Sequence, residues 1–260
     1  MQKNAFPDDK VNKLYQTFYK QRVFTLEEAS ALTKNKQVAK NAIQRLMKKR
    51  LVKRIKQGLY HIVPLDNEGY IPEPILIASK LRKKFFFSHL TALQIHDLME
   101  SSIIFMGCDK KQEFTLHKTD YQFMKAKHFG TEERIIGNQK ILVSDMERTF
   151  LDCMDNLDLF RDVDEFVSIM SNAKINSNKV LDHLKKYRKK KLYHFAGYFM
   201  ERMKEFLNPD PRDLSKIQRK LSNKVYYLQV KPKSRYSRLR DRLTKGRPKY
   251  NNRWRIIVSE

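Results

Sequence analysis

Apolar residues recur with helical spacing over the first fifty positions of the chain. A buried helix face is predicted over about residues 9–20, where the i, i+3, i+4, i+7 positions are Val11, Leu14, Tyr15 and Phe18. A short strand at 23–24 then leads to Thr25, which forms the T-x-x-E pattern of a capping box with Glu28 and predicts a second helix. Residues 33–35 form the turn before a third helix, whose N-cap is predicted at Asn35.

The third helix, over about residues 36–50, has two distinct faces. Its apolar face consists of Val38, Ala39, Ala42, Ile43, Leu46 and Met47. Its polar face consists of Gln37, Lys40, Asn41, Gln44 and Lys48. Gln and Asn pair with adenine edges and Lys with guanine or phosphate, so the polar face suits a DNA major groove. A solvated helix surface is the alternative.

The spacing of apolar residues is no longer helical after Arg50. Residues 52–56 and 59–63 predict two short strands joined at Gln57-Gly58. Two helices followed by a basic strand pair are the order of a winged helix-turn-helix, which we assign to residues 1–63. The side chains expected to contact the DNA backbone are Lys36, Arg45, Lys48, Lys53, Arg54 and Lys56.

The remainder of the chain predicts a mixed α/β domain behind a linker. Prolines and a glycine break any regular pattern over residues 64–74, and residues 75–260 follow as a larger domain, with a division near 160–175. Helices are predicted at 74–81 and 88–98. Strands are predicted at 103–106, 113–117, 126–129, 134–136 and 140–143, the last two forming a hairpin around Gly137-Asn138. The expected fold class is α+β.

The last hundred residues predict a helical and basic part. Ser144 and Glu147 form a second capping-box pattern, and Ser177 is a predicted cap further along the chain. Helical spacing continues to about residue 221. Strands are predicted at 226–230 and 254–258, separated by a loop rich in Lys and Arg.

Charge is distributed unevenly along the 260 residues. The net charge of +25 divides into +11 for residues 1–63, −5 for residues 64–173 and +19 for residues 174–260. The two basic ends favour a polyanionic partner such as nucleic acid, although an acidic protein has the same attraction. We expect a cytoplasmic protein without membrane contact, since no apolar run approaches about 18 residues and the first ten residues lack a signal-peptide centre. Cys108 and Cys153 are expected to be reduced.

Enzyme motifs are absent from the sequence. It contains no phosphate-binding loop, dinucleotide fingerprint, nucleophile elbow or H-E-x-x-H pattern, so we expect a non-enzyme without cofactor or metal. His89 and His96 are expected to have hydrogen-bonded structural roles. The eight acidic residues between 145 and 165 predict a solvated acidic surface, and a metal-dependent nuclease is the alternative. Such a nuclease would need a strand carboxylate followed by E-x-K, and no lysine lies two places after Glu113.

The basic segment near the C-terminus interleaves Tyr236, Tyr250 and Trp254 with arginines, a mixture that stacks on bases and neutralises phosphates. It predicts a second nucleic-acid surface formed by Arg235, Arg238, Arg240, Arg242, Arg247, Lys249 and Arg253. Two alternatives remain. The segment is a solvated loop with Trp254 buried in the final strand, or it is a module that binds an acidic protein.

Four blocks, in order along nearly the whole chain, resemble the AbiEi-type antitoxins of type IV toxin–antitoxin systems. They are KRIKQGLY at 53–60, FFFSHLTALQIHDL at 85–98, VSDMERTFLDCMDN at 143–156 and YNNRWRIIV at 250–258. The resemblance implies an autorepressor that binds inverted repeats in promoter DNA through a winged helix. It assigns base reading to Gln37, Lys40, Asn41 and Gln44. It also implies an antitoxin that counters a nucleotidyltransferase toxin without a stable complex, but no residue motif for that activity transfers to this sequence.

Overall fold

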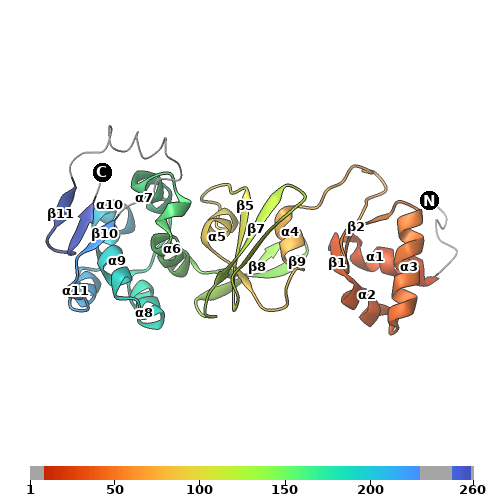
Figure 1. Cartoon of the computed structure of the whole chain (residues 1–260), viewed down its shortest axis with the longest axis horizontal. Helices are drawn as coiled ribbons and strands as arrows, with labels where there is room; N and C mark the ends of the chain where they lie inside the picture. Colours follow the sequence, from red (N-terminus) through yellow and green to blue (C-terminus); the bar gives the residue numbers. More distant parts are fainter. Residues whose placement is uncertain (1–8, 229–247, 259–260) are drawn as a thin grey trace.

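The computed structural model describes residues 9–228 and 248–258 and has a mixed α+β fold. Its elements lie along one long axis in three consecutive parts, with α3 near one end and β10 and β11 near the other (Figure 1). Among the described residues, buried apolar side chains form three clusters that follow the same order. No helix in these residues is both long enough and apolar enough to cross a membrane.

The N-terminal part contains three helices and a three-stranded antiparallel sheet. Its elements are α1 (Asp9–Tyr19), β1 (Val23–Thr25), α2 (Leu26–Thr33), α3 (Lys36–Lys48), β2 (Val52–Lys56) and β3 (Leu59–Ile62), with the sheet order β1-β3-β2. Both predicted caps are confirmed. The Thr25 side chain accepts from the Glu28 amide while Glu28 accepts from the Thr25 amide, and Asn35 accepts from the amides of Gln37 and Val38.

A bulge in β2 divides its side chains between two neighbours. Arg54 pairs with Tyr60 and Lys56 with Leu59, so Ile55 is an extra residue in the ladder. Val52 packs in the core of the N-terminal helices, whereas Ile55 belongs to the cluster of the middle part. The N-terminal sheet therefore packs on both of its sides.

The middle part is built around a six-stranded mixed sheet with the order β6-β7-β5-β4-β9-β8. Its elements are α4 (Pro74–Ala78), β4 (Phe86–Phe87), α5 (His89–Ile95), β5 (Ile103–Cys108), β6 (Gln112–Leu116), β7 (Thr119–Lys125), β8 (Thr131–Ile136) and β9 (Gln139–Ser144). The strand predicted at 126–129 is wrong: these residues form a loop. The real strand, β7, ends at Lys125 and pairs with both β6 and β5.

The C-terminal part packs helices against a small sheet of order β10-β12-β11. Its elements are α6 (Met146–Asp155), η1 (Leu157–Leu159), α7 (Val163–Ser171), α8 (Ser177–Tyr187), α9 (Lys190–Arg202), α10 (Lys204–Leu207), α11 (Pro211–Gln218), β10 (Tyr226–Leu228), β11 (Lys249–Asn251) and β12 (Ile256–Val258).

Three local predictions for this part need correction. The cap of α6 is Asp145 and not Ser144, because Ser144 is the last residue of β9 and pairs with Thr131. The cap of α8 is Asn176 and not Ser177. Trp254 is fully buried but lies in the turn before β12 and not within that strand.

Candidate nucleic-acid interface

The polar surface of α3 divides into two rows of side chains. Lys36, Lys40 and Gln44 follow at intervals of four residues and form a row that faces β2. Gln37 and Asn41 form the neighbouring row, where the Gln37 amide donates to Asn41 Oδ1 at 3.0 Å. All five side chains are exposed. The predicted base-reading residues are therefore accessible, but they do not share one line on the helix.

Met47 was predicted on the buried face of α3, and this prediction is wrong because Met47 is 38% exposed. It lies eleven residues, about three helical turns, after Lys36 and therefore joins the row that faces β2. The remaining predicted phosphate ligands on α3, Arg45 and Lys48, are exposed in its last turn.

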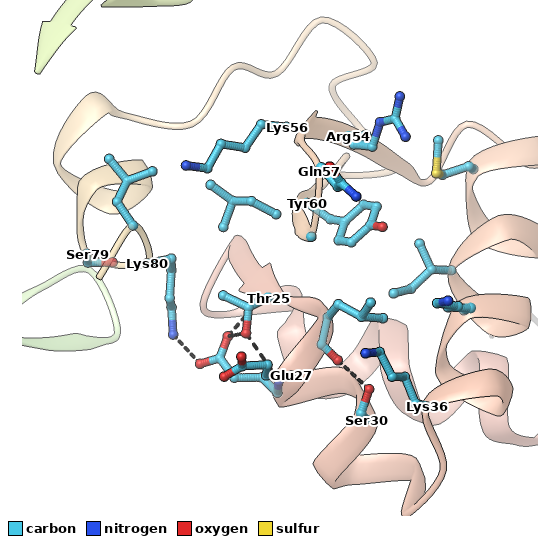
Figure 2. A pocket seen from close by; sticks show the side chains of 18 of the residues that line it. Thr25, Glu27, Ser30, Lys36, Arg54, Lys56, Gln57, Tyr60, Ser79 and Lys80 are labelled. Carbon is cyan, nitrogen blue, oxygen red and sulfur yellow. Dashed lines mark hydrogen bonds and ion pairs between the residues drawn. The ribbon is translucent and has the colours of Figure 1, made fainter. Parts of the chain in front are cut away.

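An open groove of about 1270 Å³ separates α3 from β2 and from the segment that follows α4 (Figure 2). Its basic lining residues are Lys36, Lys40, Arg54, Lys56, Lys80, Arg82 and Lys83. Its acidic lining residues are Glu27 and Glu28. Each of the two carboxylates pairs with a lysine, since Lys83 Nζ lies 2.8 Å from Glu27 and Lys80 Nζ lies 2.6 Å from Glu28. The groove consequently retains an excess of positive charge.

The predicted backbone contacts on β2 do not all lie beside the groove. Arg54 and Lys56 line the groove, and Lys56 Nζ also lies 5.6 Å from the ring centroid of Phe114. Lys53 projects to the side of the strand opposite to its neighbour Arg54, and its ammonium group donates to the Glu68 carbonyl at 3.0 Å. The structure thus brings Arg54 and Lys56 together with the α3 row and places Lys53 apart from them.

The second wall of the groove was not predicted from the sequence. Lys80, Arg82 and Lys83 belong to the basic run K-L-R-K-K, which begins two residues after the end of the short helix α4. The feature of the sequence that could have indicated this wall is the run of basic residues itself. Its position opposite α3 depends on contacts between distant segments, among them the hydrogen bond that the Gln139 amide donates to the Gln21 carbonyl at 2.6 Å.

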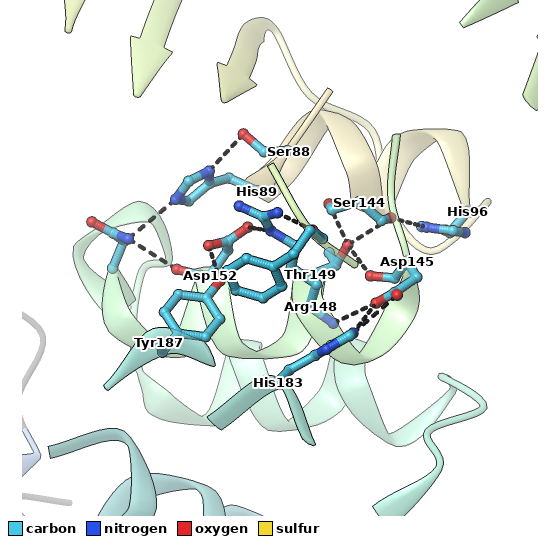
Figure 3. Close-up of polar contacts among 12 residues, drawn as sticks. Ser88, His89, His96, Ser144, Asp145, Arg148, Thr149, Asp152, His183 and Tyr187 are labelled. Atoms are coloured by element: carbon cyan, nitrogen blue, oxygen red, sulfur yellow. Dashed lines mark hydrogen bonds and ion pairs between the residues drawn. The ribbon is translucent and has the colours of Figure 1, made fainter. Parts of the chain in front are cut away.

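The acidic stretch after residue 144 is only in part the solvated surface that we predicted, since Asp158 and Asp164 are exposed but three other acids are not. Asp145, Glu147 and Asp152 are buried where α6 meets α8 (Figure 3). His183 Nε2 lies 3.0 Å from both carboxylate oxygens of Asp145, and Lys179 Nζ lies 2.9 Å from Glu147. Burial disfavours the charged form of Asp145. The hydrogen bonds from His183 and the Arg148 amide outweigh it, so the pKa of Asp145 falls to about 2.

Arg148 is the centre of this polar network. Its guanidinium carbon lies 4.1 Å from the ring centroid of Phe86 and 4.4 Å from that of Phe129. Its Nε donates to Asp152 at 3.2 Å, and its Nη1 donates to the Phe129 carbonyl. The Tyr187 hydroxyl donates to the second oxygen of Asp152. The network therefore joins the middle sheet, the 126–130 loop, α6 and α8.

Both predicted structural histidines have hydrogen-bond partners. Asn156 donates to Nε2 of His89 at 3.1 Å, and Nδ1 of His89 lies 2.9 Å from Ser88 Oγ. Burial lowers the pKa of His89, which keeps its ring neutral. His96 follows the last residue of α5, and its Nε2 lies 2.8 Å from the Ser144 carbonyl.

Most of the acids proposed for a nuclease form ion pairs or hydrogen bonds, namely Asp145, Glu147, Asp152, Asp155, Asp162, Asp164 and Glu165. Within the described ranges, no group of three or more His, Cys, Asp and Glu side chains is arranged to hold a metal ion. Asp109 lies in the turn after β5, 3.5 Å from Arg82, well separated in sequence from Asp145.

The predicted second nucleic-acid surface is only partly described by the structure. Arg235, Arg238, Arg240, Arg242 and Arg247 lie outside the described residues. Lys249 is the first residue of β11, and Arg253 forms an ion pair with Glu201.

Among known proteins, no family model matches the chain, and a search of curated proteins finds no similar sequence.

Proposed function

We propose that residues 1–63 form a winged helix-turn-helix that binds promoter DNA and represses transcription of the chain's own gene, with residues 64–74 as a linker. The arrangement that supports the proposal is the sequence of three helices followed by the β2–β3 hairpin, with α2 and α3 joined by a short turn. In this proposal α3 enters the major groove, and β2 contacts the adjacent backbone.

The single observation that carries the proposal is the exposed polar surface of α3 beside a basic groove. Gln37, Asn41 and Gln44 present amides that can each form two hydrogen bonds with an adenine edge. Lys36, Arg54 and Lys56 supply cations in the groove that Gln44 also lines. A single DNA backbone lying in the groove would pass between α3 and residues 80–83, where Lys36 and Lys40 on α3 and Arg82 on the other wall would contact phosphates.

Replacement of Gln37 and Asn41 with Ala is expected to weaken binding to the gene's own promoter by about 1–3 kcal/mol for each lost base contact. The preference for promoter over scrambled DNA should decline as well, because binding to a scrambled duplex of equal composition depends on backbone contacts alone and should not change. Fluorescence anisotropy with both duplexes, at several salt concentrations, measures the two affinities. Equal losses on promoter and scrambled DNA would refute the base-reading assignment.

Arg54 and Lys53 provide a matched comparison within the same strand. Arg54→Ala should weaken both duplexes alike and reduce the salt slope by about 1, as expected for one lost phosphate contact. Lys53→Ala, on the opposite face of β2, should change neither affinity nor slope appreciably. A larger effect at Lys53 than at Arg54 would mean that DNA does not use this groove.

We further propose that residues 75–260 act as the antitoxin against a nucleotidyltransferase toxin encoded beside this gene. The support is the resemblance of the four sequence blocks, three of which lie in this region. When this chain is coexpressed with the toxin encoded beside its gene, it should restore the growth that the toxin inhibits. The Gln37→Ala/Asn41→Ala variant should restore growth as well. Failure of the wild-type chain to restore growth would refute this second role while leaving DNA binding untouched.

A further inference from the structure

The outer face of the C-terminal sheet carries a row of exposed side chains. Tyr227 of β10 and Tyr250 of β11 both pair with Ile257 of the central strand β12. Paired residues project to the same side of a sheet, so these three form one line, the Tyr–Ile–Tyr row. Tyr227 is 67% exposed and Tyr250 is 53% exposed.

The opposite face of the same sheet is buried. Leu228, Ile256 and Val258 occupy the alternate positions and pack in the core of the C-terminal part. The two tyrosines are therefore not needed to fill the core. Neighbouring strands lie about 4.8 Å apart, which places the two tyrosines about 10 Å from each other, each available to a separate flat ligand.

A polar hollow of about 410 Å³ lies at one end of this sheet. Arg219, Arg253 and Arg255 line it together with Asn223 and Asn252, and no carboxylate is among its described lining residues. Arg253 is paired with Glu201. Arg255, in contrast, donates to two uncharged oxygens, the Ser222 carbonyl and Asn223 Oδ1, both at 2.9 Å. Its positive charge is not neutralised by these contacts.

The hollow and the Tyr–Ile–Tyr row adjoin. Strands β10 and β12 are parallel and begin at the end of the sheet where the antiparallel β11 finishes. Asn252 and Arg255 lie in the turn that joins β11 to β12, only two residues from Tyr250 and Ile257 respectively. Flat rings and cationic groups thus lie within reach of one extended ligand.

We propose that this surface binds single-stranded nucleic acid, with bases stacked on Tyr227 and Tyr250 and a phosphate held in the arginine hollow. Aromatic side chains stack on bases of any sequence, but the base faces of a duplex are already stacked on each other. Only a single strand offers both free base faces and phosphates. The charge of +19 over residues 174–260 would raise the local concentration of such a ligand.

This surface is separate from the proposed promoter-binding surface. Figure 1 places β10 and β11 near the opposite end of the molecule from α3. The inference therefore does not depend on the function proposed for the N-terminal part, and each surface can be removed without the other.

Anisotropy titration of the full chain with labelled 12-nucleotide oligo(U) and oligo(dT) tests the proposal. Replacement of either Tyr227 or Tyr250 with Ala should weaken binding about 5- to 150-fold for each base that loses its stacking partner. The Tyr227→Phe/Tyr250→Phe variant retains both rings and should bind almost as the wild type does. Phe206→Ala, at another exposed aromatic residue of the C-terminal part, is the matched control and should have no effect.

Two further measurements distinguish binding at this surface from binding elsewhere on the chain. Promoter binding should be unchanged by the Tyr227→Ala/Tyr250→Ala substitution, whereas the Gln37→Ala/Asn41→Ala variant should bind oligo(U) as the wild type does. Arg255→Ala should reduce the salt slope for oligo(U) by about 0.7. The proposal is overturned if the double alanine variant binds oligo(U) within twofold of wild type. It is equally overturned if polyglutamate displaces oligo(U) as effectively as unlabelled oligo(U) does.

Discussion

Arg148→Ala is expected to lower the free energy of unfolding by about 3–5 kcal/mol, since it removes one partner of a buried ion pair and leaves Asp152 uncompensated. The loss includes the packing of the guanidinium between Phe86 and Phe129. Urea denaturation followed by circular dichroism at pH 7 measures the change.

Arg134→Ala is the control for Arg148→Ala because it breaks an exposed ion pair with Glu132 in the middle sheet. Exposed pairs contribute about 0–1 kcal/mol, so this variant should unfold almost as the wild type does. Replacing both members of the buried pair, as in Arg148→Met/Asp152→Leu, should recover part of the lost stability. Similar losses for Arg148→Ala and Arg134→Ala would show that the buried network contributes little.

Trp254→Ala is expected to cost about 3–5 kcal/mol, the range for a large buried aromatic residue. The indole lies against Gly197 of α9, at a position where a side chain on residue 197 would overlap with it. Its N–H donates to Glu201, and its backbone carbonyl lies 2.8 Å from Nδ1 of His194. Trp254 therefore attaches the C-terminal sheet to the helices.

The same substitution should abolish oligo(U) binding, since the Tyr–Ile–Tyr row depends on the position of that sheet. Tyr250→Ala is the appropriate comparison. It changes an exposed side chain only four residues away and should alter the free energy of unfolding by no more than about 0.5 kcal/mol. Both variants should lose oligo(U) binding, so denaturation is the measurement that distinguishes the structural role of Trp254 from the binding role of Tyr250. Comparable stability for the two variants would contradict the structural role of Trp254.

Local signals in the sequence were sufficient for most elements of the N-terminal part. Thr25 and Asn35 cap the predicted helices because their side chains bond amides only two or three residues away. Such contacts need no knowledge of the remaining fold. The same local reasoning failed at Ser144-Asp145, where both residues are good caps. The choice between them depends on the pairing of Ser144 with Thr131 in the sheet.

Strand β7 was missed because its turn lacks the usual composition. His117 and Lys118 both have positive φ, 50° and 65°, where hairpins normally place Asn or Gly. Without that signal, the hairpin of β6 and β7 was not recognised, and a strand was assigned to the following loop. The parallel pairing of β7 with β5 is also a long-range contact that residue pattern alone does not determine.

In the candidate sites too, features that depend on nearby residues were predicted from the sequence, and features that depend on distant segments were not. Helical spacing correctly predicted the exposed face of α3. It did not reveal that Lys80 and Lys83 face it, or that Asp145 and Asp152 are buried beneath α8. A string of acids has the same appearance in sequence whether it is solvated or paired. Only the position of Arg148, Lys179 and His183 in the fold decides between these states.

The bulged strand β2 has an evolutionary consequence. Ile55 and Leu59 are covered by residues of the middle part, among them Ile75 and Leu76. A recombination event that exchanged the N-terminal part alone would leave these two apolar side chains against a foreign surface. The N-terminal part therefore cannot be exchanged on its own without losing this apolar contact. Residues on the two sides of this contact are expected to change in concert among descendants of the chain, even where α3 diverges.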